Sequence, residues 1–121
     1  MSKVIIPVRL ASLNEYISAM NRNRFVGAKM KREAMQTIGW HIKSLKTPNL
    51  PPYEVHIDYY EPNKKRDLDN ISAFARKVIM DSMQEMGVIS NDGWKDIIGY
   101  VEKFYVDKEN PRIEITLISK A

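Results

Sequence analysis

The feature that most constrains the fold is an alternation of apolar and polar side chains that leads into a helical repeat. Positions 53, 55, 57 and 59 are apolar or aromatic and the residues between them are mostly polar, which is the two-residue period of a half-buried strand. After a basic loop at 61–66, apolar residues recur at helical spacing over residues 70–86, and Gly87 follows as an expected C-cap. A strand and an amphipathic helix in this order predict a sheet covered by helices.

The remaining segments complete the predicted fold. Residues 3–10 suit a strand, in which Pro7 favours an edge position or a bulge because it cannot donate to a ladder. Residues 12–24 are polar and are expected to be irregular, whereas residues 28–46 have the apolar spacing of a helix. Residues 97–106 and 112–118 are predicted strands, and the turn-forming residues between them favour a hairpin. We therefore expect one α+β domain over residues 1–121, with a mixed sheet of about four strands and two main helices.

Size and composition exclude several classes of protein. The 121 residues include no cysteine, which rules out disulfides and thiolate zinc sites. The longest apolar runs are far shorter than the roughly 20 residues of a membrane span, and the start lacks the apolar stretch of a signal peptide. We expect a soluble, cytoplasmic protein, and the net charge of +4 favours an anionic partner.

The basic residues form two clusters, which we predict to contact DNA phosphates together with the later Lys95. The first cluster could equally be a solvated helix face. The predicted DNA-binding residues are Arg22, Arg24, Lys29, Lys31 and Arg32 in the first cluster, Lys64, Lys65 and Arg66 in the second, and Lys95.

The segment with the clearest chemistry is residues 64–70, where three basic residues precede Asp67-Leu68-Asp69 at a strand-to-helix junction. In extended backbone Asp67 and Asp69 point the same way, while Leu68 points into the core. Two carboxylates so placed suit Mg²⁺, which prefers oxygen ligands, water and substrate phosphate. Asp92 supplies a third acid after the helix, provided that the chain doubles back after Gly87.

Each acid also has a structural interpretation. Asp69 could be the N-cap of the helix, and Asp92 could cap a turn ahead of Gly93, because aspartate is favoured at both kinds of position. A cluster of cations beside a cluster of acids favours the chemical interpretation, since cleavage of a phosphodiester needs cations for the backbone and carboxylates for a metal ion.

Three segments closely resemble the signature of RusA-type crossover-junction endodeoxyribonucleases. They are the run at 66–70, the helix that carries Lys77 and Asp81, and residues 87–92. Residues 12–16 are similar to the family's Asn-containing segment after the first strand, and residues 91–95 and 106–112 resemble its phage and Gram-positive branch. The resemblance covers nearly the whole chain.

The resemblance implies a homodimeric, Mg²⁺-dependent enzyme, with Mn²⁺ as an alternative ion, that resolves four-way (Holliday) junctions by paired symmetric nicks. Asp67, Asp69 and Asp92 take the positions of the family's three catalytic aspartates, which would hold one or two metal ions. The resemblance also implies a phage or prophage origin, and no membrane or organic cofactor is expected. The wide apolar face of the second helix suits a dimer, although a crowded core within one chain would look the same.

The family also uses a lysine on the second helix, and here the sequence departs from the pattern. Counting from the two acids selects Ala73, whereas alignment on Asp81 and Gly87 selects Lys77, as if one helical turn had been inserted. We take Lys77 as the candidate, although Arg76 lies closer to the azimuth of Asp69 and a solvated helix lysine is an equal alternative.

Two other functions remain open at the level of sequence. A non-catalytic DNA-binding or regulatory module would use the same cations and would shift DNA without cutting it. A metal-dependent nuclease acting on flaps or other branched DNA would share the site, and only its choice of substrate would distinguish it.

Overall fold

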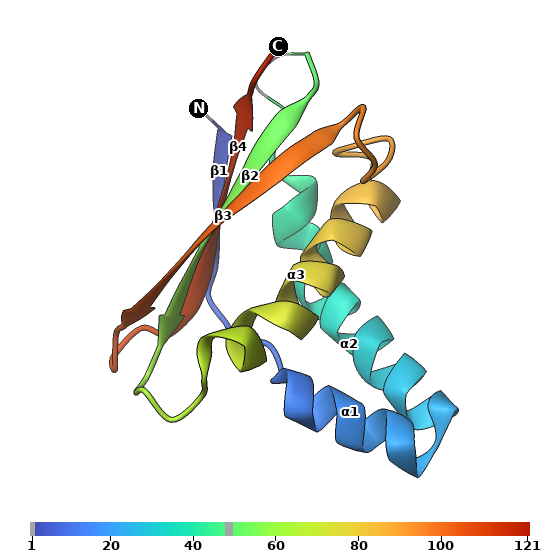
Figure 1. The fold of residues 1–121 in the computed structure, drawn as a ribbon, viewed down its shortest axis with the longest axis vertical. Helices are drawn as coiled ribbons and strands as arrows, with labels where there is room; N and C mark the ends of the chain where they lie inside the picture. The colour runs from blue at the N-terminus through green and yellow to red at the C-terminus, as the bar shows by residue number, and fades with distance from the viewer. Residues whose placement is uncertain (1, 48–49) are drawn as a thin grey trace.

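The computed structural model describes residues 2–47 and 50–121, which form three helices and four strands. The order along the chain is β1 (Ser2–Ile6), α1 (Leu13–Arg22), α2 (Arg24–Lys43), β2 (Tyr53–Glu61), α3 (Leu68–Glu85), β3 (Ile97–Val106) and β4 (Arg112–Ser119). The strands form one mixed sheet in the order β1-β4-β2-β3, and the three helices lie on one side of it (Figure 1). The predicted α+β class and mixed four-stranded sheet are confirmed.

Strand β2 lies in the interior of the sheet and carries the alternation seen in the sequence. Val55, Ile57 and Tyr59 are buried beneath the helices, whereas the residues between them are half-buried on the open face. Because β2 pairs in parallel with β3, the chain must cross over between these strands, and α3 makes that crossover. The crossover places the start of α3 beside the end of β2.

The predicted hairpin between the last two strands is wrong. Strand β2 lies between β3 and β4, pairing in parallel with the first and antiparallel with the second. The connecting turn passes the end of β2, where the Asp107 N–H donates to the Glu61 carbonyl over 2.8 Å. The Asp107 carboxylate accepts from the N–H groups of Glu109 and Asn110, so turn chemistry is present without the pairing that it usually accompanies.

The segment expected to be irregular is instead the helix α1. Ser12 and Glu15 form a capping box, in which each side chain accepts from the backbone N–H of the other. Asn23 ends α1 and caps α2 with its side chain, so α2 begins four residues before the predicted start at Ala28 and ends at Lys43 rather than Lys46. The first strand ends at Ile6, short of the predicted position 10, and β1 lies at the sheet edge as expected.

The wide apolar face of α3 is buried within this chain. Phe74, Val78, Ile79 and Met83 are all at most 2% exposed in the core between the sheet and the other helices. Of the two alternatives for this face, the crowded core within one chain is the one that the structure has. Gly87 follows the helix with a φ of +74°, which confirms its predicted role in ending α3.

Helix α1 packs on α2 and α3 at the lower edge of the molecule (Figure 1). Tyr16 of α1 stacks on Phe74 of α3 with 4.4 Å between ring centroids, which packs the first turn of α1 against the second turn of α3. None of the helices in residues 2–47 and 50–121 has the length and hydropathy that a membrane span requires.

Candidate functional site

Asp67 and Asp69 stand at the first turn of α3, where the chain leaves the basic loop after β2. Asp67 is the N-cap residue in extended backbone, with φ −68° and ψ 159°, but its side chain makes no capping hydrogen bond. Asp69 lies inside the first helical turn. The helix therefore begins earlier than predicted, and Leu68 is 57% exposed instead of pointing into the core. Two carboxylates are presented to solvent at the positive end of the helix dipole.

Neither Asp69 nor Asp92 has the capping role that was the structural alternative for it. Asp69 is not the N-cap of α3, and the turn at Gly93 is capped by Asn91, whose Oδ1 accepts the Gly93 N–H over 2.7 Å. Asp67, Asp69 and Asp92 are all exposed, and within the described ranges none of their carboxylates makes a hydrogen bond or ion pair. Their carboxylates are free to bind a cation or a ligand.

A single chain does not bring Asp92 to the other two acids. The chain does reverse after Gly87, but Asp92 lies beside residues 97–100 at the start of β3. Asp67 instead lines a pocket with residues 104–106 at the other end of that strand. Between Tyr100 and Phe104 the strand rises about 13 Å, at roughly 3.3 Å per residue. Among the described residues, no group of three His, Cys, Asp or Glu side chains is placed to hold a metal ion.

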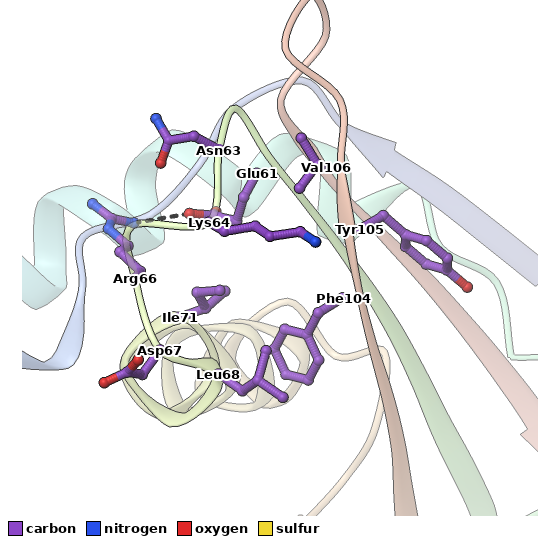
Figure 2. A pocket seen from close by; sticks show the side chains of 10 residues that line it. All are labelled: Glu61, Asn63, Lys64, Arg66, Asp67, Leu68, Ile71, Phe104, Tyr105 and Val106. Carbon is purple, nitrogen blue, oxygen red and sulfur yellow. Dashed lines mark ion pairs between the residues drawn. The ribbon is translucent and has the colours of Figure 1, made fainter.

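The pocket beside Asp67 has an apolar floor and a basic rim. Its volume is about 570 Å³, and Figure 2 shows Lys64 extending across it while the Asp67 carboxylate points away from Phe104. The lining residues are Glu61, Asn63, Lys64, Arg66, Asp67, Leu68, Ile71, Phe104, Tyr105 and Val106. Lys64 on the rim is placed to contact phosphate, the group to which most protein–DNA hydrogen bonds go.

The three cations of the loop differ in what they contact. Lys64 and Lys65 are exposed, so their ammonium groups can reach phosphate. Arg66 is directed into the protein, where it donates to the Leu10 carbonyl over 3.0 Å and to the Glu15 carboxylate over 2.9 Å. This commitment of Arg66 was not visible in the sequence.

Two acids near the site are neutralised by arginine. Arg9 donates both Nε and Nη2 to the buried Glu61, at 3.2 and 2.7 Å, and Arg66 stands 3.9 Å from the same carboxylate. The capping hydrogen bond from the Ser12 backbone lowers the pKa of Glu15, and Arg66 lowers it further. Sequence reasoning missed Arg9, Glu15 and Glu61, although the Ser-x-x-Glu spacing of a capping box was a signal for Glu15.

The first basic cluster surrounds the junction of α1 and α2. Arg22, Arg24, Lys29 and Arg32 are exposed there. Lys31 is half-buried, and its Nζ lies 2.5 Å from the Asp81 carboxylate of α3. Lys31 therefore ties α2 to α3, while the other four form a basic surface. Lys95 is exposed in the loop after α3, three residues beyond Asp92.

The two candidate cations of α3 face different neighbours. Lys77 is 62% exposed and its Nζ lies 3.8 Å from Asp81, on the side of α3 that faces α2. Arg76 faces the sheet, where it donates to Glu102 over 2.6 Å and lies over the ring of Tyr100. Arg76 is thus the cation on the side of Asp92.

The hydroxyl groups of Tyr100 and Tyr59, which lie near Arg76 and Glu102, both have raised pKa values. Burial raises the pKa of the Tyr100 hydroxyl, Arg76 opposes the rise, and the negative charge of Asp92 adds to it. Burial also raises the pKa of Tyr59 far above its usual range, so its hydroxyl stays protonated and donates to Glu102 over 2.7 Å. Glu102 is therefore held by two donors, one from β2 and one from α3.

The donors at the start of α3 fit a hard divalent cation. Asp67 and Asp69 offer carboxylate oxygens that have no other partner, and water and phosphate oxygens commonly fill the rest of a Mg²⁺ shell. The described residues that line the pocket beside Asp67 include no methionine, cysteine or histidine, so the ligands there are oxygen donors, which suit Mg²⁺ better than softer transition metals.

Comparison with known proteins places the chain in a family. The family model described as "Endodeoxyribonuclease RusA" matches residues 5–118, which is nearly the whole sequence. No curated protein matches the chain. The match begins within β1, takes in the three helices and strands β2 and β3 in full, and ends one residue before the end of β4, so its range includes Asp67, Asp69 and Asp92. The chain therefore belongs to the RusA family of Holliday-junction-resolving endodeoxyribonucleases.

Proposed function

We propose that this protein is a Mg²⁺-dependent endonuclease that resolves four-way DNA junctions by paired, symmetric nicks, with Asp67, Asp69 and Asp92 as its catalytic carboxylates. The observation that carries the proposal is that some acids near the site form ion pairs while the three aspartates do not. Near Asp67, Glu15 and Glu61 form ion pairs with arginines, whereas the carboxylates of the three aspartates make no hydrogen bond or ion pair among the described residues. Unpaired carboxylates at the edge of a basic surface are what a phosphodiester-cleaving site needs.

The residues of the chain divide the work of cleavage. Asp67 and Asp69 would hold Mg²⁺, which when bound supplies a Lewis acid that polarises the scissile phosphate and activates water. Lys64 and Lys65 hold the neighbouring DNA backbone, and the exposed cations at the α1–α2 junction contact a more distant arm. Because these contacts are to phosphate, recognition follows the shape of the junction and weakens as salt rises.

A second copy of the chain would complete the site. Strand β3 lies at an edge of the sheet, and its residues Tyr100 and Val106 are 42% and 50% exposed. In a two-fold dimer with its axis near the middle of β3, the start of one β3 faces the end of the other. Asp92 of each chain would then approach Asp67 and Asp69 of its partner.

Mixing two inactive variants tests this sharing of residues. In a heterodimer of Asp69→Asn and Asp92→Asn chains, one of two shared sites keeps all its aspartates, so we expect nicking to reappear. If each chain holds its own complete site, both sites in the mixture are defective and no nicking returns. A monomer mass by light scattering at micromolar concentration would also contradict the dimer.

The proposed activity is tested with a fixed four-way junction, a flap and a linear duplex, each incubated with Mg²⁺. Asp69→Asn should abolish cleavage of the junction and keep or improve its binding, because it removes metal affinity while lowering negative charge near DNA. Glu85→Gln serves as a matched control, since it removes an exposed acid at the far end of α3. DNA binding without cutting would favour a regulatory module, and preferred cutting of the flap would favour a different branched substrate.

On α3, we infer that Arg76 rather than Lys77 acts near the scissile phosphate. Arg76 lies beside Tyr100 and so toward Asp92, whereas Lys77 faces Asp81 and α2. Lys77→Met should therefore cleave junctions at nearly the wild-type rate. A large loss of cleavage in Lys77→Met, with the fold intact, would instead restore the lysine to the active site.

A further inference from the structure

The residues on either side of Asp67 and Asp69, the two acids that we propose as catalytic on α3, are hydrogen-bonded to the chain at the start of α1. Arg66, the residue before Asp67, donates to the Leu10 carbonyl and the Glu15 carboxylate. Asn70, the residue after Asp69, accepts the Asn14 N–H through its Oδ1 over 2.9 Å. The five-residue stretch from 66 to 70 is thus held at each end by a segment more than 50 residues away in sequence.

The contacts on the Asn70 side serve both helices. The Asn14 N–H lies in the first turn of α1, where backbone donors have no partner inside the helix. Asn70 satisfies this donor from outside, so the beginning of α1 is bound to the beginning of α3. The stacking of Tyr16 on Phe74 adds an apolar contact one turn further along.

The contacts on the Arg66 side depend on Glu15. Its Oε1 accepts both from the Ser12 backbone, in the capping box, and from the Arg66 guanidinium. A carboxylate beside the path of an anionic substrate opposes DNA binding by charge repulsion. Outside the capping box, the Glu15 carboxylate accepts a hydrogen bond from Arg66, the residue that precedes Asp67.

We propose that Glu15 is a positioning residue for cleavage: acting through Arg66, it fixes the backbone on which Asp67 and Asp69 are mounted. The proposal rests on the proposed function, because it assigns Glu15 a task in the same site. It also moves Arg66 from contact with DNA phosphate to support of the acids. Displacement of a reacting group by about 1 Å can lower a rate roughly 100-fold, so partial loosening should be measurable.

The test compares Glu15→Ala, Glu15→Gln and Ser12→Ala in the full-length protein. Glu15→Ala should lower kcat for junction cleavage about 10-fold with KM unchanged, and should weaken binding of Mn²⁺ alone, measured by electron paramagnetic resonance, by a similar factor. Glu15→Gln keeps an oxygen that can accept from Arg66, so it should recover most of both losses. Ser12→Ala breaks the capping box without touching Arg66, so it should lower the melting temperature and leave kcat unchanged.

A double-mutant comparison tests whether Glu15 acts through Arg66. If it does, Glu15→Ala in an Arg66→Ala background should cleave no more slowly than Arg66→Ala alone. Losses that multiply would overturn the proposal, as would a Glu15→Gln variant as defective as Glu15→Ala, because charge rather than position would then be responsible. Wild-type rates and Mn²⁺ affinity in Glu15→Ala would overturn it too.

The two proposals fail in different ways. If the wild-type protein cuts no branched DNA in Mg²⁺, the proposed function is wrong, and the Mn²⁺ affinities still decide whether Glu15 positions the acids. If the wild-type protein cuts junctions and Glu15→Ala equals it in rate and in Mn²⁺ affinity, the function stands and the positioning role is wrong.

Discussion

Replacing Arg76 by Met should destabilise the protein far more than the same change at the neighbouring Lys77. Arg76 makes a charge-assisted hydrogen bond of 2.6 Å to Glu102, whose side chain is only 15% exposed. Such a bond contributes about 1.5–3 kcal/mol, and the lower end applies because the Arg76 side chain is itself 39% exposed. Contact with the Tyr100 ring adds roughly 0.5 kcal/mol.

The total for Arg76→Met is therefore about 2 kcal/mol. With an unfolding entropy of about 2.1 cal/mol/K per residue, this corresponds to a fall in melting temperature of roughly 8 °C. Lys77→Met removes an exposed ion pair and should change the free energy of unfolding by less than about 0.5 kcal/mol. Urea denaturation and thermal melting of both variants measure the difference. Equal shifts for the two variants would refute the assignment of Arg76 to the inward-facing network.

Three further predictions concern stability and DNA binding. Lys3 and Arg112 lower the pKa of Glu114 below its usual 4.5, so the stabilising effect of its ion pairs is present above that pH and is lost as the pH falls. Glu114→Gln should therefore flatten the acid side of the curve of unfolding free energy against pH, and an unchanged curve would contradict this. Gly27→Ala should cost about 1–3 kcal/mol in urea denaturation, because its Cβ would lie 3.2 Å from the Met20 Cα across the α1–α2 contact; wild-type stability would show that the helices can separate. Lys64→Ala and Lys65→Ala should each reduce the salt dependence of junction binding by about one phosphate contact in fluorescence anisotropy, and a parallel salt plot would exclude the contact.

The elements predicted from the sequence are those whose periodicity is set by burial. The alternation at 53–59 and the apolar repeats before and after it correspond to β2, α2 and α3, which make most of the core. Helix α1 was missed although half of its ten residues are apolar, because only Ala19 is buried and its apolar face is short. The capping box at Ser12 and Glu15 was a local signal for the start of that helix.

The pairing of the last two strands and the ion pairs of individual side chains could not be predicted from local sequence. Residues 107–111 have turn chemistry, but nothing in them specifies that β2 lies between the strands they join. In the same way, the motif makes Asp67 and Asp69 candidates, whereas only the tertiary structure directs Arg66 toward Glu15 and Lys31 toward Asp81. The separation of Asp92 from the other acids also depends on long-range geometry, because it is set by the length of α3 and the course of β3.

The most direct measurement is the rate of strand cleavage for a fixed four-way junction and for a linear duplex with the same arm sequences, in Mg²⁺, with every strand end-labelled. The account predicts nicks in two opposing strands of the junction at symmetric positions, and little or no cutting of the duplex. An absence of nicks with both Mg²⁺ and Mn²⁺, or equal cutting of junction and duplex, would contradict it.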